Sequence, residues 1–213
     1  RSRSLVGMAV AYGSGEPDVV YFPAEGFLTG DYLKEKLTEL QKQIPVFCVM
    51  DGKEFLKDMP DADEAHLFDA GIAAYLLNPL KSQYSYDDIV KEYVHRYVPA
   101  VEEIFGGSKI PAAGKMTPEQ QESYAGYQAY AVFAAQENME KLLKEQGMWD
   151  LYRNVEIPLV FTLRQMEADG IAAEKEHFPF TELSWRSGSE SWRHRSTRRP
   201  ARSSTSIPRS SSA

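Results

Sequence analysis

The chain has 213 residues, of which 43% are hydrophobic and 26% are charged, as in a globular protein of one domain or slightly more. Its formal net charge of −7 excludes a general electrostatic attraction to nucleic acid. A single cysteine, Cys48, excludes an internal disulfide framework, and no stretch reaches the roughly 18 apolar residues of a membrane span, so we expect a cytoplasmic protein without membrane contact.

The first 50 residues combine strand and helix patterns. Leu5–Tyr12 and Asp18–Phe22 are short apolar runs separated by a glycine-rich turn, and they predict a β-hairpin. Residues 31–43 place leucines at i, i+4 and i+7, which predicts a helix, and Pro45 separates it from an expected strand over 46–50. The order strand, strand, helix, strand predicts an α/β fold.

Most of the remaining chain is expected to be helical. Short helices are predicted over residues 53–57, 70–77, 86–97 and 100–105, with His66–Asp69 leading into the second of them. Thr117-Pro118-Glu119-Gln120 combines an N-cap, a first-turn proline and a capping box, and therefore predicts the start of a long helix.

This long helix should run to about Gln146, before Gly147. A second long helix is predicted from Trp149 to Ala168, and Pro158 should kink it.

Aspartates that follow expected strands are the first candidates for chemistry. Several carboxylates converging on one point could hold Mg²⁺ or Mn²⁺, and Asp51 directly follows a buried strand. The simpler interpretation, which we favour, is that Asp51 caps the next helix, and Asp69 allows the same two interpretations.

Other polar and aromatic residues give weaker signals. Tyr124, Tyr127 and Tyr130 recur every third residue, which indicates a packing stripe more strongly than a base-stacking surface. Cys48 lies in the middle of an expected strand and is expected to be a buried apolar thiol. The four histidines (His66, His95, His177 and His194) have no metal-binding spacing.

Three segments together resemble the family A DNA polymerases, the bacterial DNA polymerase I family. They are FDAGIAAYLLNP at 68–79, YAGYQA at 124–129, and LYRNVEIPLV at 151–160 followed by MEADGI at 166–171. The resemblance implies an RNase H-like 3'-5' exonuclease-type domain over residues 1–146. It also implies that residues 147–176 form the first helix of the polymerase thumb.

The resemblance also defines positions to inspect for exonuclease activity. Proofreading members hold metal ions with four carboxylates. The first two form an Asp-x-Glu pair, which would lie upstream of Leu5. Because the chain also lacks an initiator Met, we expect it to be a piece of a longer protein. Asp51 matches the third carboxylate. Tyr124 matches a tyrosine that precedes the fourth, but Gln128 replaces that Asp.

A neutral amide cannot supply the charge that holds a second metal, so the resemblance implies an inactive, structural domain. We expect no catalytic or metal-binding residue and no cofactor in this chain, although the full-length family uses Mg²⁺. DNA would be its partner only through the complete polymerase, which synthesises DNA in replication and repair. The alternative hypothesis is an active metal-dependent 3'-5' exonuclease.

The C-terminal residues 177–213 differ sharply from the rest of the chain. They contain seven Arg, two Glu and eleven Ser, and they have too few apolar residues to form a core, so we expect a disordered tail. One hypothesis is a basic nucleic-acid-binding tail. We favour a frameshift near residues 174–177, because codons compatible with Ser203–Ala213 encode FNINSPKQLG in a shifted frame, which resembles the thumb signature of the family.

Overall fold

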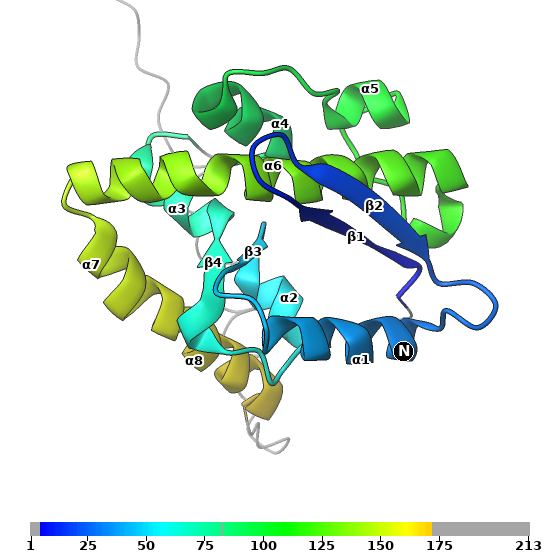
Figure 1. Ribbon diagram of the computed structural model, residues 1–213, viewed down its shortest axis with the longest axis horizontal. Helices are drawn as coiled ribbons and strands as arrows, with labels where there is room; N and C mark the ends of the chain where they lie inside the picture. Colours follow the sequence, from blue (N-terminus) through cyan, green and yellow to red (C-terminus); the bar gives the residue numbers. More distant parts are fainter. Residues whose placement is uncertain (1–4, 82, 172–213) are drawn as a thin grey trace, which may run out of the picture. The chain divides into compact units, whose positions relative to one another are not determined.

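The structure, a computed structural model, describes residues 5–81 and 83–171 (Figure 1). The elements below lie in the first of two compact units, which covers residues 1–169. This part is a mixed α/β structure, mostly helical with two small sheets. The presence of both helices and strands agrees with the predicted α/β class. No helix within the described ranges is long and apolar enough to cross a lipid bilayer. The predicted tail lies outside the described residues.

The N-terminal residues form the predicted hairpin. Strand β1 (Gly7–Tyr12) pairs antiparallel with β2 (Asp18–Pro23), in a register that joins Gly7 to Pro23 and Tyr12 to Asp18. The connecting turn contains Gly13 at φ 119° and Gly15 at φ 89°, a backbone conformation that glycine adopts without steric cost.

A second, parallel pair of strands follows. Helix α1 (Gly30–Gln41) leads to β3 (Phe47–Val49), and helix α2 (Gly52–Asp58) then connects β3 to β4 (Leu67–Asp69). The expected helices and the expected strand over 46–50 are confirmed, but residues 67–69 form a strand where only a lead-in to a helix was predicted. Burial and pairing with β3 create this short strand, and neither is visible in a three-residue pattern.

The central part of the chain contains short helices. Helix α3 (Ala70–Leu77) has the predicted bounds, and α4 (Tyr86–Ile89) continues as a π-helical turn over Val90–Val94. The helix predicted to reach residue 97 therefore ends earlier. Single 3₁₀ turns occur at residues 64–66 and 113–115, and α5 (Val101–Phe105) lies between them in the sequence.

The long helix α6 (Pro118–Glu145) begins as predicted. The side chain of Thr117 accepts a hydrogen bond from Gln120 N–H, and the Gln120 side chain accepts one from Thr117 N–H, which completes the capping box. Gly147, at φ 70°, separates α6 from the C-terminal helical segment.

The C-terminal segment contains a break near Pro158, though in a different form from the predicted kink. Helix α7 (Trp149–Leu151) passes into a π-helical turn at Tyr152–Glu156 and then into α8 (Ile157–Asp169). In a regular α-helix the ring of Pro158 would collide with the carbonyl four residues earlier. The π-helical turn at Tyr152–Glu156 contains this carbonyl, which belongs to Asn154.

Helix α6 is the element around which the core forms. It contacts the hairpin, β3 and α3, and Figure 1 shows it running past both small sheets. The main hydrophobic cluster joins α3, α6 and the C-terminal segment; its fully buried members include Ala73, Ala135, Met139, Leu143, Tyr152 and Ile157. A smaller cluster lies between α4 and α6 and contains Tyr86, Val90, Val98 and Ala131.

Candidate functional site

The parallel strands β3 and β4 end beside each other, and an aspartate begins the helix after each of them. Asp51 accepts a hydrogen bond from Glu54 N–H at 2.9 Å and caps α2. Asp69 accepts one from Ile72 N–H at 3.0 Å and caps α3. Both capping predictions are therefore confirmed.

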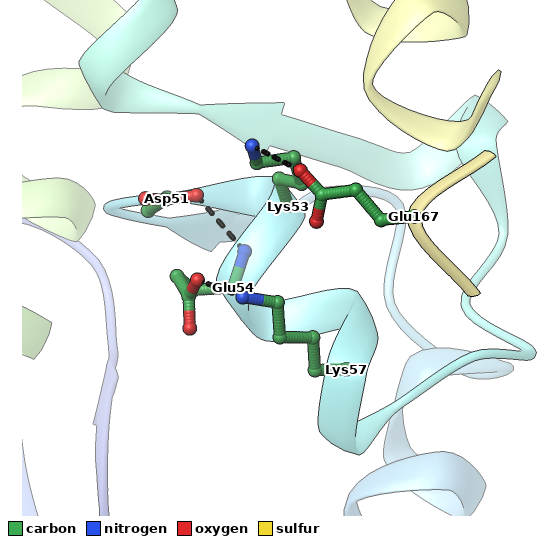
Figure 2. A network of polar contacts seen from close by, with 5 residues as sticks. All are labelled: Asp51, Lys53, Glu54, Lys57 and Glu167. Atoms are coloured by element: carbon green, nitrogen blue, oxygen red, sulfur yellow. Dashed lines mark hydrogen bonds and ion pairs between the residues drawn. The ribbon is translucent and has the colours of Figure 1, made fainter. Parts of the chain in front are cut away.

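The surroundings of Asp51 are exposed and contain charges of both signs. Figure 2 shows Asp51 at the start of α2, with Lys53 pointing toward Glu167 of α8. Lys53 Nζ and Glu167 Oε1 are 2.8 Å apart, and Lys57 forms an ion pair with Glu54 one turn later. Three acidic side chains and two lysines thus lie together around the start of α2.

Asp69 is buried, with only 3% of its surface exposed, and it connects several elements. Besides capping α3, its Oδ2 accepts a hydrogen bond of 2.6 Å from Gly52 N–H in the first turn of α2. Its backbone N–H donates to the Tyr152 hydroxyl at 2.7 Å, and that hydroxyl donates to the Asp69 carbonyl oxygen at 3.2 Å. Asp69 therefore links α2, α3 and the C-terminal segment.

Burial determines the protonation of this aspartate. It raises the pKa of the Asp69 carboxyl to about 6, although the N–H donors of Ile72 and Gly52 favour the charged form. The negative charge of Asp51 acts in the same direction as burial. Burial likewise raises the pKa of the Tyr152 hydroxyl far above its ordinary value.

A surface depression of about 440 Å³ lies beside these residues. It is lined by Met50, Asp51, Lys53, Asp69, Gly71, Ile72, Tyr84, Val160 and Leu163. Within residues 5–81 and 83–171, no group of three or more His, Cys, Asp or Glu side chains could hold a metal ion. Asp51 and Asp69 thus both line the depression, and no third acidic side chain among the described residues joins them in a metal-binding group.

The two other predicted site residues lie on α6. Tyr124 packs against Tyr86, with ring centroids 5.9 Å apart, and against Phe105 at 5.4 Å. Burial raises the pKa of the Tyr124 hydroxyl, and a hydrogen bond with the Gln128 side chain opposes part of this rise. Neither Tyr124 nor Gln128 is among the described residues that line the depression beside Asp51.

The tyrosines on α6 pack as predicted. Tyr124, Tyr127 and Tyr130 all lie against the smaller hydrophobic cluster, and the Tyr127 and Tyr86 rings stack with centroids 6.4 Å apart. Cys48 is partly buried, and burial raises the pKa of its thiol to about 12.

Sequence reasoning missed Tyr152 and Gly52 as partners of Asp69. Gly52 is 17 residues from Asp69, and Tyr152 is 83 residues away. No local motif encodes either contact. The one available signal was that a tyrosine in the main core needs a partner for its hydroxyl.

Part of the sequence is similar to a known DNA polymerase. Over 110 residues, or 50% of the chain, the sequence is 26% identical to DNA polymerase I of Bacillus subtilis (strain 168). The match covers 12% of that relative's length, so the similarity concerns a small part of it. No protein-family model matches the chain. The similarity supports a relationship to DNA polymerase I at a coarse level.

Proposed function

We propose that this chain is a piece of a family A DNA polymerase whose parent performs DNA-templated DNA synthesis. Residues 5–146 would form a non-catalytic, RNase H-like 3'-5' exonuclease-type domain, and the segment that follows would begin the thumb. The observation that carries the proposal is the 110-residue similarity to DNA polymerase I of Bacillus subtilis. The order of the motifs at 68–79, 124–129 and 151–171 agrees with it.

Two features support an inactive exonuclease site. Gln128 is a neutral residue where proofreading relatives are expected to have a carboxylate. Asp51 is engaged as the cap of α2. A neutral amide at position 128 supplies no charge to hold the second metal ion of the exonuclease reaction.

The surface of the C-terminal segment supports its assignment as the start of a thumb. Apolar side chains spaced three or four residues apart are 39–62% exposed along it: Leu151, Val155, Leu159, Leu163 and Met166. Such a stripe is typical of a helix that packs against a further element. In the proposed parent, the remainder of the polymerase would cover it.

A nuclease assay tests the inactive site. The purified chain should leave a 5'-labelled single-stranded DNA intact in Mg²⁺ and in Mn²⁺, and it should not extend a primer. Digestion that requires the metal and disappears in Asp51→Ala would support the alternative, an active 3'-5' exonuclease.

A chimera tests the proposed place in a polymerase. The matching segment of Bacillus subtilis DNA polymerase I would be replaced by residues 5–169 of this chain. We expect the chimera to fold and extend primers without exonuclease activity. A chimera in which the same residues are inserted in scrambled order is the control, and equal behaviour of the two would contradict the proposal.

Resequencing the source DNA tests the frameshift proposed for residues 177–213, which lie outside the described structure. One additional base near the codons of residues 174–177 should open a frame that encodes FNINSPKQLG. An intact reading frame without it would make the basic tail a genuine part of the product.

A further inference from the structure

The guanidinium of Arg153, in the π-helical turn before α8, binds the backbone that leads into β4. Nη1 donates to the carbonyl oxygen of Leu67 at 3.0 Å. Nη2 donates to the carbonyl oxygen of Glu64, also at 3.0 Å, and to that of Ala65. A planar guanidinium carries several donors in a fixed geometry, so it can bind neighbouring carbonyls together. Arg153 thus joins the C-terminal segment to backbone groups that lie 86 to 89 residues earlier.

Tyr152, the preceding residue, binds the next part of the same backbone from within the core. Its hydroxyl accepts a hydrogen bond from Asp69 N–H at 2.7 Å and donates to the Asp69 carbonyl oxygen at 3.2 Å. Its ring is fully buried and packs against Phe68, with centroids 5.4 Å apart. Two adjacent side chains therefore hold five backbone groups within residues 64–69.

The turns on either side of this pair also pack against the domain. Before it, the Nζ atom of Lys144 in α6 lies 4.9 Å from the centre of the Trp149 ring, which is cation–π distance. After it, Ile157 and Val160 are buried. A Cβ added at Gly52 would lie 3.3 Å from Val160 Cγ1, so α8 packs directly against the backbone at the start of α2.

We propose that Tyr152 and Arg153 are positioning residues, which fix the direction in which α8 leaves the domain. The inactive domain then acts as a rigid base for the thumb, whose identity rests on the function proposed for the parent polymerase. Residues 149–160 would accordingly belong to the core of the exonuclease-like domain, and the thumb would begin after them. The opposite face of the segment, with its exposed apolar stripe from Leu151 to Met166, remains for the part that follows.

Hydrogen exchange of the unmodified chain at increasing urea tests whether the segment belongs to the core. A segment built into the core opens only when the core opens. The amides of Val160 and Phe161 should therefore exchange with the same urea dependence as those of Ala135 and Met139 in α6. A helix of this length that is held only by its connection would be marginal and would open alone. Faster exchange of the α8 amides that does not respond to urea would overturn the proposal.

Arg153→Met tests the guanidinium, because it keeps an apolar side chain and removes the three hydrogen bonds. The α8 amides should then leave the shared profile and exchange about tenfold faster than those of α6, since the segment can open before the core does. Arg96→Met is the matched control, because it breaks an exposed ion pair with Glu16 in the hairpin turn. If the two variants kept the same profile, Arg153 would not position the segment.

Tyr152→Phe gives an independent test that keeps the buried ring. The N–H group of Asp69 loses its acceptor, and we expect its amide and those of α8 to exchange faster than the amides of α6. Tyr86→Phe is the control, because it removes a hydroxyl that donates to the Pro99 carbonyl oxygen, away from the C-terminal segment. A uniform change across all amides, as expected from Tyr86→Phe, would make Tyr152 a core residue without a positioning role.

The chimera with Bacillus subtilis DNA polymerase I tests the consequence for the parent. If the base of the thumb loses its fixed direction, Arg153→Met should raise the KM for primer–template several-fold and leave kcat for single-nucleotide addition unchanged. Arg96→Met should change neither. Equal KM values for the two variants would contradict the positioning role. A chimera of the unmodified chain that does not extend a primer would instead contradict the proposed function, and the exchange experiments on the chain alone would still decide whether the segment is fixed.

Discussion

The ends of β3 and β4 place two aspartates in the same local setting with different surroundings. Each follows a short strand of the same parallel pair and caps the helix that comes next. Asp51 is exposed and lies among charged residues, whereas Asp69 is buried and is also bound by Gly52. Asp51 thus stabilises only the start of α2, whereas Asp69 caps α3 and also connects it to α2.

This difference shows what capping contributes in a small α/β domain. An exposed cap satisfies one N–H that water could also satisfy, so its loss costs little. At a buried cap, water cannot replace the lost acceptor, and the unpaired N–H groups carry the full desolvation cost. The following substitutions test this contrast, from the largest expected effect to the smallest.

Replacing Asp69 should have the largest effect. In Asp69→Ala the N–H groups of Gly52 and Ile72 both lose their acceptor in a buried site, and the free energy of unfolding should fall by about 3 kcal/mol. Urea unfolding at pH 7 measures the change. A loss below that of Asp51→Ala would remove the contrast between the two caps.

Replacing Gly71, which packs closely against the backbone beside Asp69, should have the second-largest effect on stability. A Cβ added at Gly71 would lie 2.7 Å from the Met50 carbonyl oxygen, which cannot move without disturbing the strand end. Gly71→Ala should therefore destabilise the domain by about 2 kcal/mol. Gly107→Ala is the control, because nothing lies within 4 Å of a Cβ there. Equal unfolding midpoints for the two variants would contradict this account.

Local patterns predicted most helix starts in this fold. The capping box at Thr117 and the aspartate caps at positions 51 and 69 can be recognised from three or four neighbouring residues. The leucine pattern of α1 was also correct for Leu33 and Leu37, although Leu40 is 44% exposed in the last turn of the helix.

Features that depend on distant partners could not be predicted in the same way. Strand β4 has three residues that are all buried, so it has no alternation, and it exists because β3 pairs with it. The Tyr152 contact to Asp69 joins positions 83 residues apart. Local sequence thus predicted Asp69 as a cap and gave no indication of its second helix or of its burial.

Replacing the exposed cap should have a moderate effect. Asp51→Ala removes the acceptor of Glu54 N–H at the start of α2 and should lower the free energy of unfolding by about 1 kcal/mol. Asp51→Ser, which keeps a capping oxygen, is the control and should recover most of the loss. If Asp51→Ala and Asp69→Ala were equally destabilising, burial would not distinguish the two caps.

The ion pair between Lys53 and Glu167 should have the smallest effect. It joins α2 to α8 across 114 residues of sequence, yet both side chains are more than a third exposed. The gain from such a pair is offset by the entropy of fixing two long side chains, and salt screens it. Lys53→Met should therefore leave the urea midpoint nearly unchanged, and the remaining difference should vanish at high salt. Lys36→Met, which breaks a local pair with Glu39, is the matched control. A clearly larger loss for Lys53→Met that persists in salt would mean that α8 depends on this pair, and that the buried contacts of Asp69 and Tyr152 are not sufficient to hold the C-terminal segment in place.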